Sequence, residues 1–161
     1  MLNRPRIGTR AARIRALLTV LTLGIAALAG AQAAGDPKAA PAPLCTPDDH
    51  TLCLDQGRFA VTADFTPTPT GPSFAAHAVP VTDQTGDFWF FDPANVELIV
   101  KVLNGCSPPF NTYWFFAAGL TNVGVDITVF DLKTNTQQRY TNDPNTPFPP
   151  IQDTNAFQTC P

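Results

Sequence analysis

From residue 58 onward, hydrophobic and polar residues alternate with a period of two through most of the chain. The alternation is clearest in the segments 58–64, 96–103 and 123–130. A period of two places successive side chains on opposite faces of a β-strand, so each segment is predicted to be a strand with one buried face. After residue 44 no stretch repeats its apolar residues every 3.6 positions, and the pattern therefore predicts no helix.

Two further strands are predicted where large aromatic residues occupy both faces, at 88–91 and 113–118, and the second is expected to be central. Segment 76–82 contains Pro80, which confines that strand to a sheet edge or a bulge. A short strand is predicted at 137–141, with turns or loops at 66–73, 85–87, 131–136 and 142–150. Seven or eight short strands at regular spacing predict an antiparallel β-sandwich of the immunoglobulin-like type, with a small closed barrel as the alternative.

The first 33 residues have the composition of a secretory signal peptide. Five arginines precede an apolar stretch at 16–29, and residues 31–33 (Ala-Gln-Ala) have the form of a cleavage site. The arginines are never adjacent, which favours the general secretory route. A Pro/Ala-rich linker is predicted at 34–44 and a single domain at 45–161. We expect a protein that is secreted or held in the periplasm or cell envelope, without membrane insertion after signal removal; a retained N-terminal anchor is the alternative.

Removal of the signal peptide makes the protein strongly acidic. Five of its ten basic residues lie in the signal, whereas all thirteen acidic residues follow it, so the mature chain carries a formal charge of −8. Such a charge repels phosphate backbones and anionic membrane surfaces. Nucleic acid is therefore excluded as an expected partner.

The mature chain contains four cysteines, Cys45, Cys53, Cys106 and Cys160. An even number of cysteines in an exported protein predicts two disulfides, and three connectivities are possible. We favour Cys45–Cys53, which closes a short N-terminal loop, together with Cys106–Cys160, which ties down the C-terminus. No C-x-x-C pair is present, so zinc is not predicted.

Residues suited to catalysis are scarce. The mature chain has two serines and two histidines, and Ser73, four residues before His77, does not lie in a G-x-S-x-G elbow. Glu97 is the one acidic residue inside a hydrophobic strand, and Lys101 on the same face is expected to pair with it. No phosphate-binding loop, metalloprotease motif or dinucleotide fingerprint occurs. No catalytic residue and no cofactor is predicted.

Several aspartates of the chain are candidate calcium ligands. Residues 48–50 (Asp-Asp-His) and the series Asp83, Asp87 and Asp92 contain the oxygen ligands that calcium prefers, but neither has the spacing of an EF-hand. Aspartate is also the residue that turns recruit for local hydrogen bonds. We therefore interpret these aspartates as turn residues and predict no metal site.

The aromatic residues are the most distinctive feature of the chain. Segments 88–91 (Phe-Trp-Phe-Phe) and 113–116 (Tyr-Trp-Phe-Phe) place large rings on both faces of two strands, so half of the rings face outward. Loops such as 66–73 or 142–150 are expected to cover them. The alternative is an exposed apolar platform that binds a sugar, peptide or protein, with Trp89 and Trp114 as the candidate ligand-binding residues.

Several of these segments together resemble a module that is common in exported bacterial proteins and is generally uncharacterised. They are Leu52-Cys53-Leu54, Gly57-Arg58-Phe59, residues 86–91, Asn95-Val96-Glu97-Leu98, residues 101–106, Tyr113-Trp114-Phe115 and Thr128-Val129-Phe130-Asp131, and the resemblance runs from about Cys45 to Cys160. It implies a secreted all-β domain, alone or attached to larger extracellular proteins, and carries no activity or catalytic residue.

The sequence therefore predicts an exported, disulfide-stabilised β-sandwich that acts as a non-catalytic binding module for an extracellular protein or glycan. A secreted protease inhibitor is the first alternative, with the loop 45–53 or 104–112 as the inhibitory segment. A weak hydrolase that uses Glu97 and His77 is the second.

Overall fold

The computed structural model describes residues 44–161; the predicted signal peptide (1–33) and residues 34–43 of the predicted linker lie outside the described residues. The described residues form ten β-strands and no helix, as the period of two predicts. The strands are β1 (Thr51–Leu54), β2 (Phe59–Thr66), β3 (Phe74–Ala75), β4 (His77–Thr82), β5 (Thr85–Trp89), β6 (Leu98–Gly105), β7 (Thr112–Gly119), β8 (Gly124–Asp131), β9 (Thr136–Asn142) and β10 (Ile151–Phe157).

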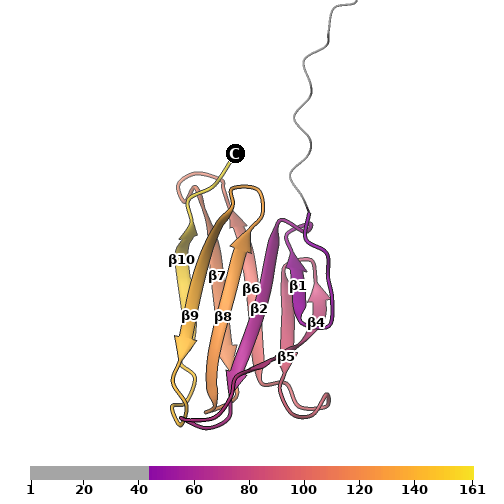
Figure 1. Cartoon of the computed structure of the whole chain (residues 1–161). Helices are drawn as coiled ribbons and strands as arrows, with labels where there is room; N and C mark the ends of the chain where they lie inside the picture. Colours follow the sequence, from indigo (N-terminus) through magenta and orange to yellow (C-terminus); the bar gives the residue numbers. More distant parts are fainter. Residues whose placement is uncertain (1–43) are drawn as a thin grey trace, which may run out of the picture. The chain divides into compact units, whose positions relative to one another are not determined.

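The strands form two antiparallel sheets of five strands each (Figure 1). Sheet A has the order β1-β2-β8-β9, and β3 also pairs with β2. Sheet B has the order β10-β7-β6-β5-β4. The predicted disulfide-stabilised antiparallel β-sandwich is confirmed, with ten strands instead of seven or eight.

The core lies between the two sheets because each strand turns its apolar residues inward. In β2, Phe59, Val61 and Ala63 are buried, while the residues between them are partly exposed. Phe59 packs against Tyr113 of sheet B with ring centroids 5.0 Å apart, and Phe115 stacks on Tyr140 of sheet A at 4.7 Å. These contacts across the sandwich hold the two sheets together by burial of apolar surface.

The chain changes sheets at one edge within a few residues. β3 pairs with β2 in sheet A, and β4 begins sheet B after the single residue Ala76, whose amide donates to Ala63. β4 is an edge strand with a register shift between Pro80 and Thr82, as predicted from the proline. At the opposite edge, the hydroxyl of Tyr140 in β9 donates to Asp153 in β10 over 2.9 Å.

The strands differ in detail from the sequence predictions, since residues 90–91 lie outside β5 and residues 96–97 lie outside β6. Residues 85–87, predicted as a turn, form the first part of β5, because they pair with 99–101 of β6. The strand β10 was not predicted, since its polar residues show no clear alternation. β1 and β3 were also missed, since strands of four and two residues are too short to show a period.

The two disulfides are those predicted, Cys45–Cys53 and Cys106–Cys160. Disulfides form and persist in oxidising compartments outside the cytosol, which agrees with export. Within residues 44–161, no helix is long and apolar enough to cross a membrane.

Candidate functional site

The outward side of sheet B carries large apolar side chains where solvent-facing polar residues would be expected. We call this surface the outer face. It consists of the alternate residues whose strand neighbours are buried, namely Thr85, Asp87 and Trp89 of β5, Ile99, Lys101 and Leu103 of β6, and Trp114, Phe116 and Ala118 of β7. An antiparallel sheet that covers a core on one side normally presents polar residues on the other, so this composition needs an explanation.

A hollow of about 290 Å³ lies on the outer face. Its floor is one row of side chains across four neighbouring strands, in which Thr85 lies opposite Lys101, Lys101 opposite Phe116, and Phe116 opposite Gln152. Ile99 and Pro150 also line it, and Ile99 is 43% exposed. The hollow is thus largely apolar, with three polar side chains around one aromatic ring.

Trp89 lies at one end of the outer face and is partly covered by a histidine. His77 of β4 is its partner across the strands, and the two rings stack with centroids 3.8 Å apart. His50 lies next to His77, at 4.8 Å between ring centroids, and its Nδ1 lies 2.9 Å from the carbonyl oxygen of Ala76. Trp89 is therefore held in place by β4 and is half-buried.

Trp114 lies at the other end, next to the loop between β6 and β7. Its indole nitrogen donates to the hydroxyl of Thr112 over 3.0 Å. Phe110 packs edge-on against it at 4.9 Å, and Phe116 lies 6.2 Å away. Phe110 is 57% exposed, so the loop adds an aromatic side chain to this end of the outer face.

The two tryptophans share the outer face but do not contact each other. The positions of the two tryptophans can be compared along β6. Trp114 lies opposite Leu103. Trp89 lies two residues beyond Asp87, which is the partner of Ile99, and is therefore level with residue 97. Six residues along a strand separate these positions, which is ~20 Å. The hollow lies between them, and its central residues, Phe116 and Lys101, were not predicted as ligand-binding residues. Alternation places them outward, but nothing in the sequence indicates which outward residues surround a hollow.

The loops expected to cover the outward rings do not cover them with their own aromatic residues. Phe148 of the loop 142–150 is buried in the core instead, where it packs against Gly119. The rings on the outer face are covered only in part, by neighbouring side chains such as His77 and Phe110.

The expected ion pair between Glu97 and Lys101 is not formed. Glu97 is 7% exposed and accepts a hydrogen bond from the side-chain amide of Asn95 over 2.5 Å. Among residues 44–161 the ion pairs are Arg58–Asp131 and Arg139–Asp126, so the ammonium group of Lys101 has no carboxylate partner there.

The other candidate residues from the sequence have local roles. Ser73 donates to the carbonyl of Phe65 and not to His77. Asp48, Asp83 and Asp92 accept backbone hydrogen bonds from His50, Gln56 and Ala94. The bonds to Asp48 and Asp92 are the local contacts of turn residues, as predicted. The bond to Asp83 comes from a residue 27 positions away, and Asp87 lies in β5 instead of a turn. No group of three or more metal-ligating side chains occurs among the described residues.

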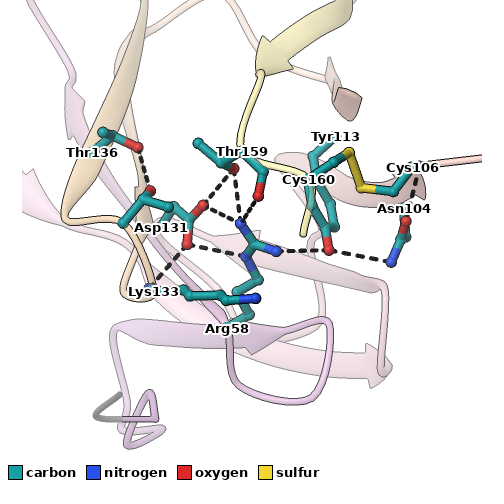
Figure 2. Close-up of polar contacts among 10 residues, drawn as sticks. Arg58, Asn104, Cys106, Tyr113, Asp131, Lys133, Thr136, Thr159 and Cys160 are labelled. Carbon is teal, nitrogen blue, oxygen red and sulfur yellow. Dashed lines mark hydrogen bonds and ion pairs between the residues drawn. A yellow bond between two sulfur atoms is a disulfide. The ribbon is translucent and has the colours of Figure 1, made fainter. Parts of the chain in front are cut away.

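A polar network that the sequence did not reveal joins the two sheets at one end of the sandwich (Figure 2). Arg58, just before β2, makes two hydrogen bonds to Asp131 at the end of β8, of 3.0 and 2.6 Å. It also donates to the hydroxyl of Tyr113 in β7 over 2.7 Å and to the carbonyl oxygen of Thr159 over 2.8 Å. Asn104 donates to the same Tyr113 hydroxyl.

The charges of this network are buried and matched. Asp131 is fully buried, and the side chain of Arg58 is 10% exposed. Burial opposes the ionisation of Asp131, but hydrogen bonds from Arg58 and Thr159 outweigh it and hold its pKa below the ordinary value. The same pair raises the pKa of Arg58 against the effect of its own burial. A hollow of about 290 Å³ borders the network at Thr159. Every buried side-chain polar atom among the described residues has a hydrogen-bond partner, so the network is a structural connection between the sheets.

Comparisons with family models, with curated proteins and with solved structures find no match to this chain. What the protein does is therefore inferred from the geometry of the outer face.

Proposed function

We propose that this protein is an exported, non-catalytic binding module whose ligand occupies the outer face of sheet B. The observation that carries the proposal is the hollow between Trp89 and Trp114, built by side chains of four adjacent strands. Ligand sites are typically concave and mostly apolar, with a few polar groups that fix orientation. The hollow is concave, and its exposed lining is almost wholly apolar.

The energetics of exposure support the same interpretation. Large side chains such as Ile99 and Phe110 lose favourable burial energy when they face water, at about 25 cal/mol for each Å² of apolar surface. Single exposed apolar residues are common on proteins, but a contiguous exposed patch marks an interaction site. On the outer face, Ile99 lies opposite Ala118 and Leu103 lies opposite Trp114, so apolar residues are neighbours across β6 and β7.

The proposal is tested by affinity capture with matched variants. The oxidised mature chain is immobilised and exposed to envelope and culture-fluid fractions of the producing cells. Ile99→Asp and Phe116→Ser alter the outer face. Leu44→Asp and Phe74→Ser make the same kinds of change at exposed positions away from the outer face, since Leu44 is 69% and Phe74 48% exposed.

We expect the unaltered chain and the two control variants to retain the same material, and the two outer-face variants to lose it. Equal retention by all five proteins would show that binding, if any, does not use the outer face. Retention of nothing above a reduced and unfolded control would also contradict the proposal. Circular dichroism of each variant establishes that a loss of binding is not a loss of fold.

A second candidate function, inhibition of an extracellular protease, is favoured by the exposed Phe110 in a loop that Cys106 anchors to Cys160. Such a loop offers an aromatic side chain on a covalently constrained segment. The domain would then inhibit a protease of one catalytic class, and Phe110→Asp would abolish inhibition. A lack of inhibition of serine, cysteine, aspartic and metalloproteases would exclude this function.

The resemblance to a secreted bacterial module remains a prediction and is compatible with either function.

A further inference from the structure

The polar side chains around the hollow have no partners within the described part of the chain. Thr85, Lys101 and Gln152 line the hollow and make no side-chain hydrogen bond to another described residue. They lie in one cross-strand row with Phe116. The exposed lining of the hollow is almost wholly apolar, so these residues contribute their carbon atoms to it, and the hydroxyl, ammonium and amide groups lie outside that lining.

The outer face also carries both signs of charge close together. Asp87 lies opposite Ile99, and Lys101 lies two residues further along the same strand, so the two are diagonal neighbours. No ion pair joins them or connects either to another described residue. Burial raises the pKa of Asp87. A ligand on this face therefore meets strong donors and strong acceptors.

This combination suits a neutral polyhydroxylated ligand better than a protein or a polyanion. The net charge of −8 repels a second copy of the chain and anionic polymers. Protein interfaces are depleted in lysine and aspartate at their centres, because burial of unpaired charges is costly. Sugar hydroxyls both donate and accept, so they can bond to Lys101 and Asp87 alike without introducing a charge.

We propose that the outer face binds a neutral polysaccharide, an inference that rests on the proposed function and specifies its ligand. Phe116 provides the apolar surface on which the C–H side of a sugar ring packs, while the polar groups of Lys101, Thr85 and Gln152, which lie outside the apolar lining, bond to its hydroxyls. The tryptophans at the two ends of the face, ~20 Å apart by strand register, extend the site beyond one sugar ring. The ligand is accordingly a chain of sugars that lies along the strands.

The test is native affinity electrophoresis of the oxidised mature chain, which migrates as an anion. The gels contain galactomannan, xyloglucan, arabinoxylan, dextran, or the neutral polysaccharide fraction of the producing cells after proteinase digestion. Polygalacturonate is the anionic comparison. Mobility is referred to a polymer-free gel, so that a change of charge in a variant does not affect the result.

We expect at least one neutral polymer to retard the protein. Phe116→Ala and Lys101→Met should each weaken binding about tenfold, because each removes one desolvated contact. Phe74→Ala, an exposed aromatic residue of β3, should leave the dissociation constant unchanged.

Retardation by none of the neutral polymers, or by polygalacturonate alone, would overturn the inference. The polysaccharide inference would also fail if proteinase treatment of the cell fractions abolished capture that depends on the outer face, because the ligand would then be a protein. The proposed binding function would still stand in that case. If sedimentation equilibrium showed a dimer that Ile99→Asp dissociates, the occupant would be a second copy. Capture that is independent of the outer face would remove the proposed function as well.

Discussion

The guanidinium group of Arg58 is bound by residues from three other segments that are distant in sequence. Its two hydrogen bonds to Asp131 are of the paired, charge-assisted type, and its Cζ atom lies 4.2 Å from the ring centre of Tyr113. A buried charge is costly unless it is paired, so each member of this network depends on the others.

We expect Asp131→Asn to lower the free energy of unfolding by about 3–5 kcal/mol, because it leaves Arg58 buried without its counter-charge. The matched control is Asp126→Asn. Asp126 pairs with Arg139 on the surface, where the side chain of Arg139 is 65% exposed, so this loss should be about 1 kcal/mol or less. Equilibrium unfolding in urea measures both. Similar losses in the two variants would contradict a special role for the buried pair.

The same pair predicts a dependence of stability on pH. Since the pKa of Asp131 is lower in the folded chain than its ordinary value of 3.8, the folded state binds this proton less readily than the unfolded state. The stabilisation is therefore present above pH 3.8 and is lost as the pH falls through the lower folded pKa. Urea unfolding from pH 6 downward should show the difference between the unaltered chain and Asp131→Asn shrinking only below about pH 4. A constant difference would contradict the assignment.

At the scale of a strand, β7 carries aromatic rings on both faces and separates them by alternation. Phe115 points into the core, fully buried, and stacks on Tyr140 of the opposite sheet. Phe116 points outward and borders the hollow. Adjacent residues of the same type thus have different environments, which allows stability and binding to be measured separately.

We expect Phe115→Ala to lower the free energy of unfolding by about 3–5 kcal/mol, because it removes a buried ring and leaves a cavity. Phe116→Ala should cost about 1 kcal/mol, since its ring is only half-buried. Urea unfolding of the two variants gives the comparison. If Phe116→Ala proved as destabilising as Phe115→Ala, the outer face would be part of the structural core and not a binding surface.

At the scale of the whole molecule, the disulfides act on different lengths of chain. Cys45–Cys53 spans 8 residues at the start of the domain, and Cys106–Cys160 spans 54 residues and fixes the C-terminal segment. That segment contains Thr159, whose carbonyl oxygen and hydroxyl both accept from Arg58. The long disulfide therefore also supports the buried network.

Removal of the long disulfide should be the more damaging change. Loop-closure entropy gives about 4 kcal/mol for Cys106–Cys160 and about 2.5 kcal/mol for Cys45–Cys53. We expect the replacement of both Cys106 and Cys160 by Ser to lower the free energy of unfolding more than the replacement of both Cys45 and Cys53 does. Urea unfolding under oxidising conditions tests the order. A greater loss from the short loop would show that the C-terminal segment contributes little.

The sequence by itself determined the strands with strong alternation, the sandwich class and the favoured disulfide pairing. These features depend on local chain properties: period, turn residues and an even number of cysteines. Residues such as Trp89 and Trp114 could also be placed on faces of strands. Alternation alone does not say which of the two faces of such a strand is turned to solvent.

The tertiary structure decided everything that depends on which strands are neighbours. Strand register places Lys101 beside Phe116, and the packing of the two sheets brings Arg58 to Asp131 across 73 residues. The edge strand β10 forms because β7 is available as its partner, although its own residues do not alternate clearly. The alternation of hydrophobic and polar residues is a property of a single strand, whereas a hollow or a buried ion pair exists only where several distant strands meet.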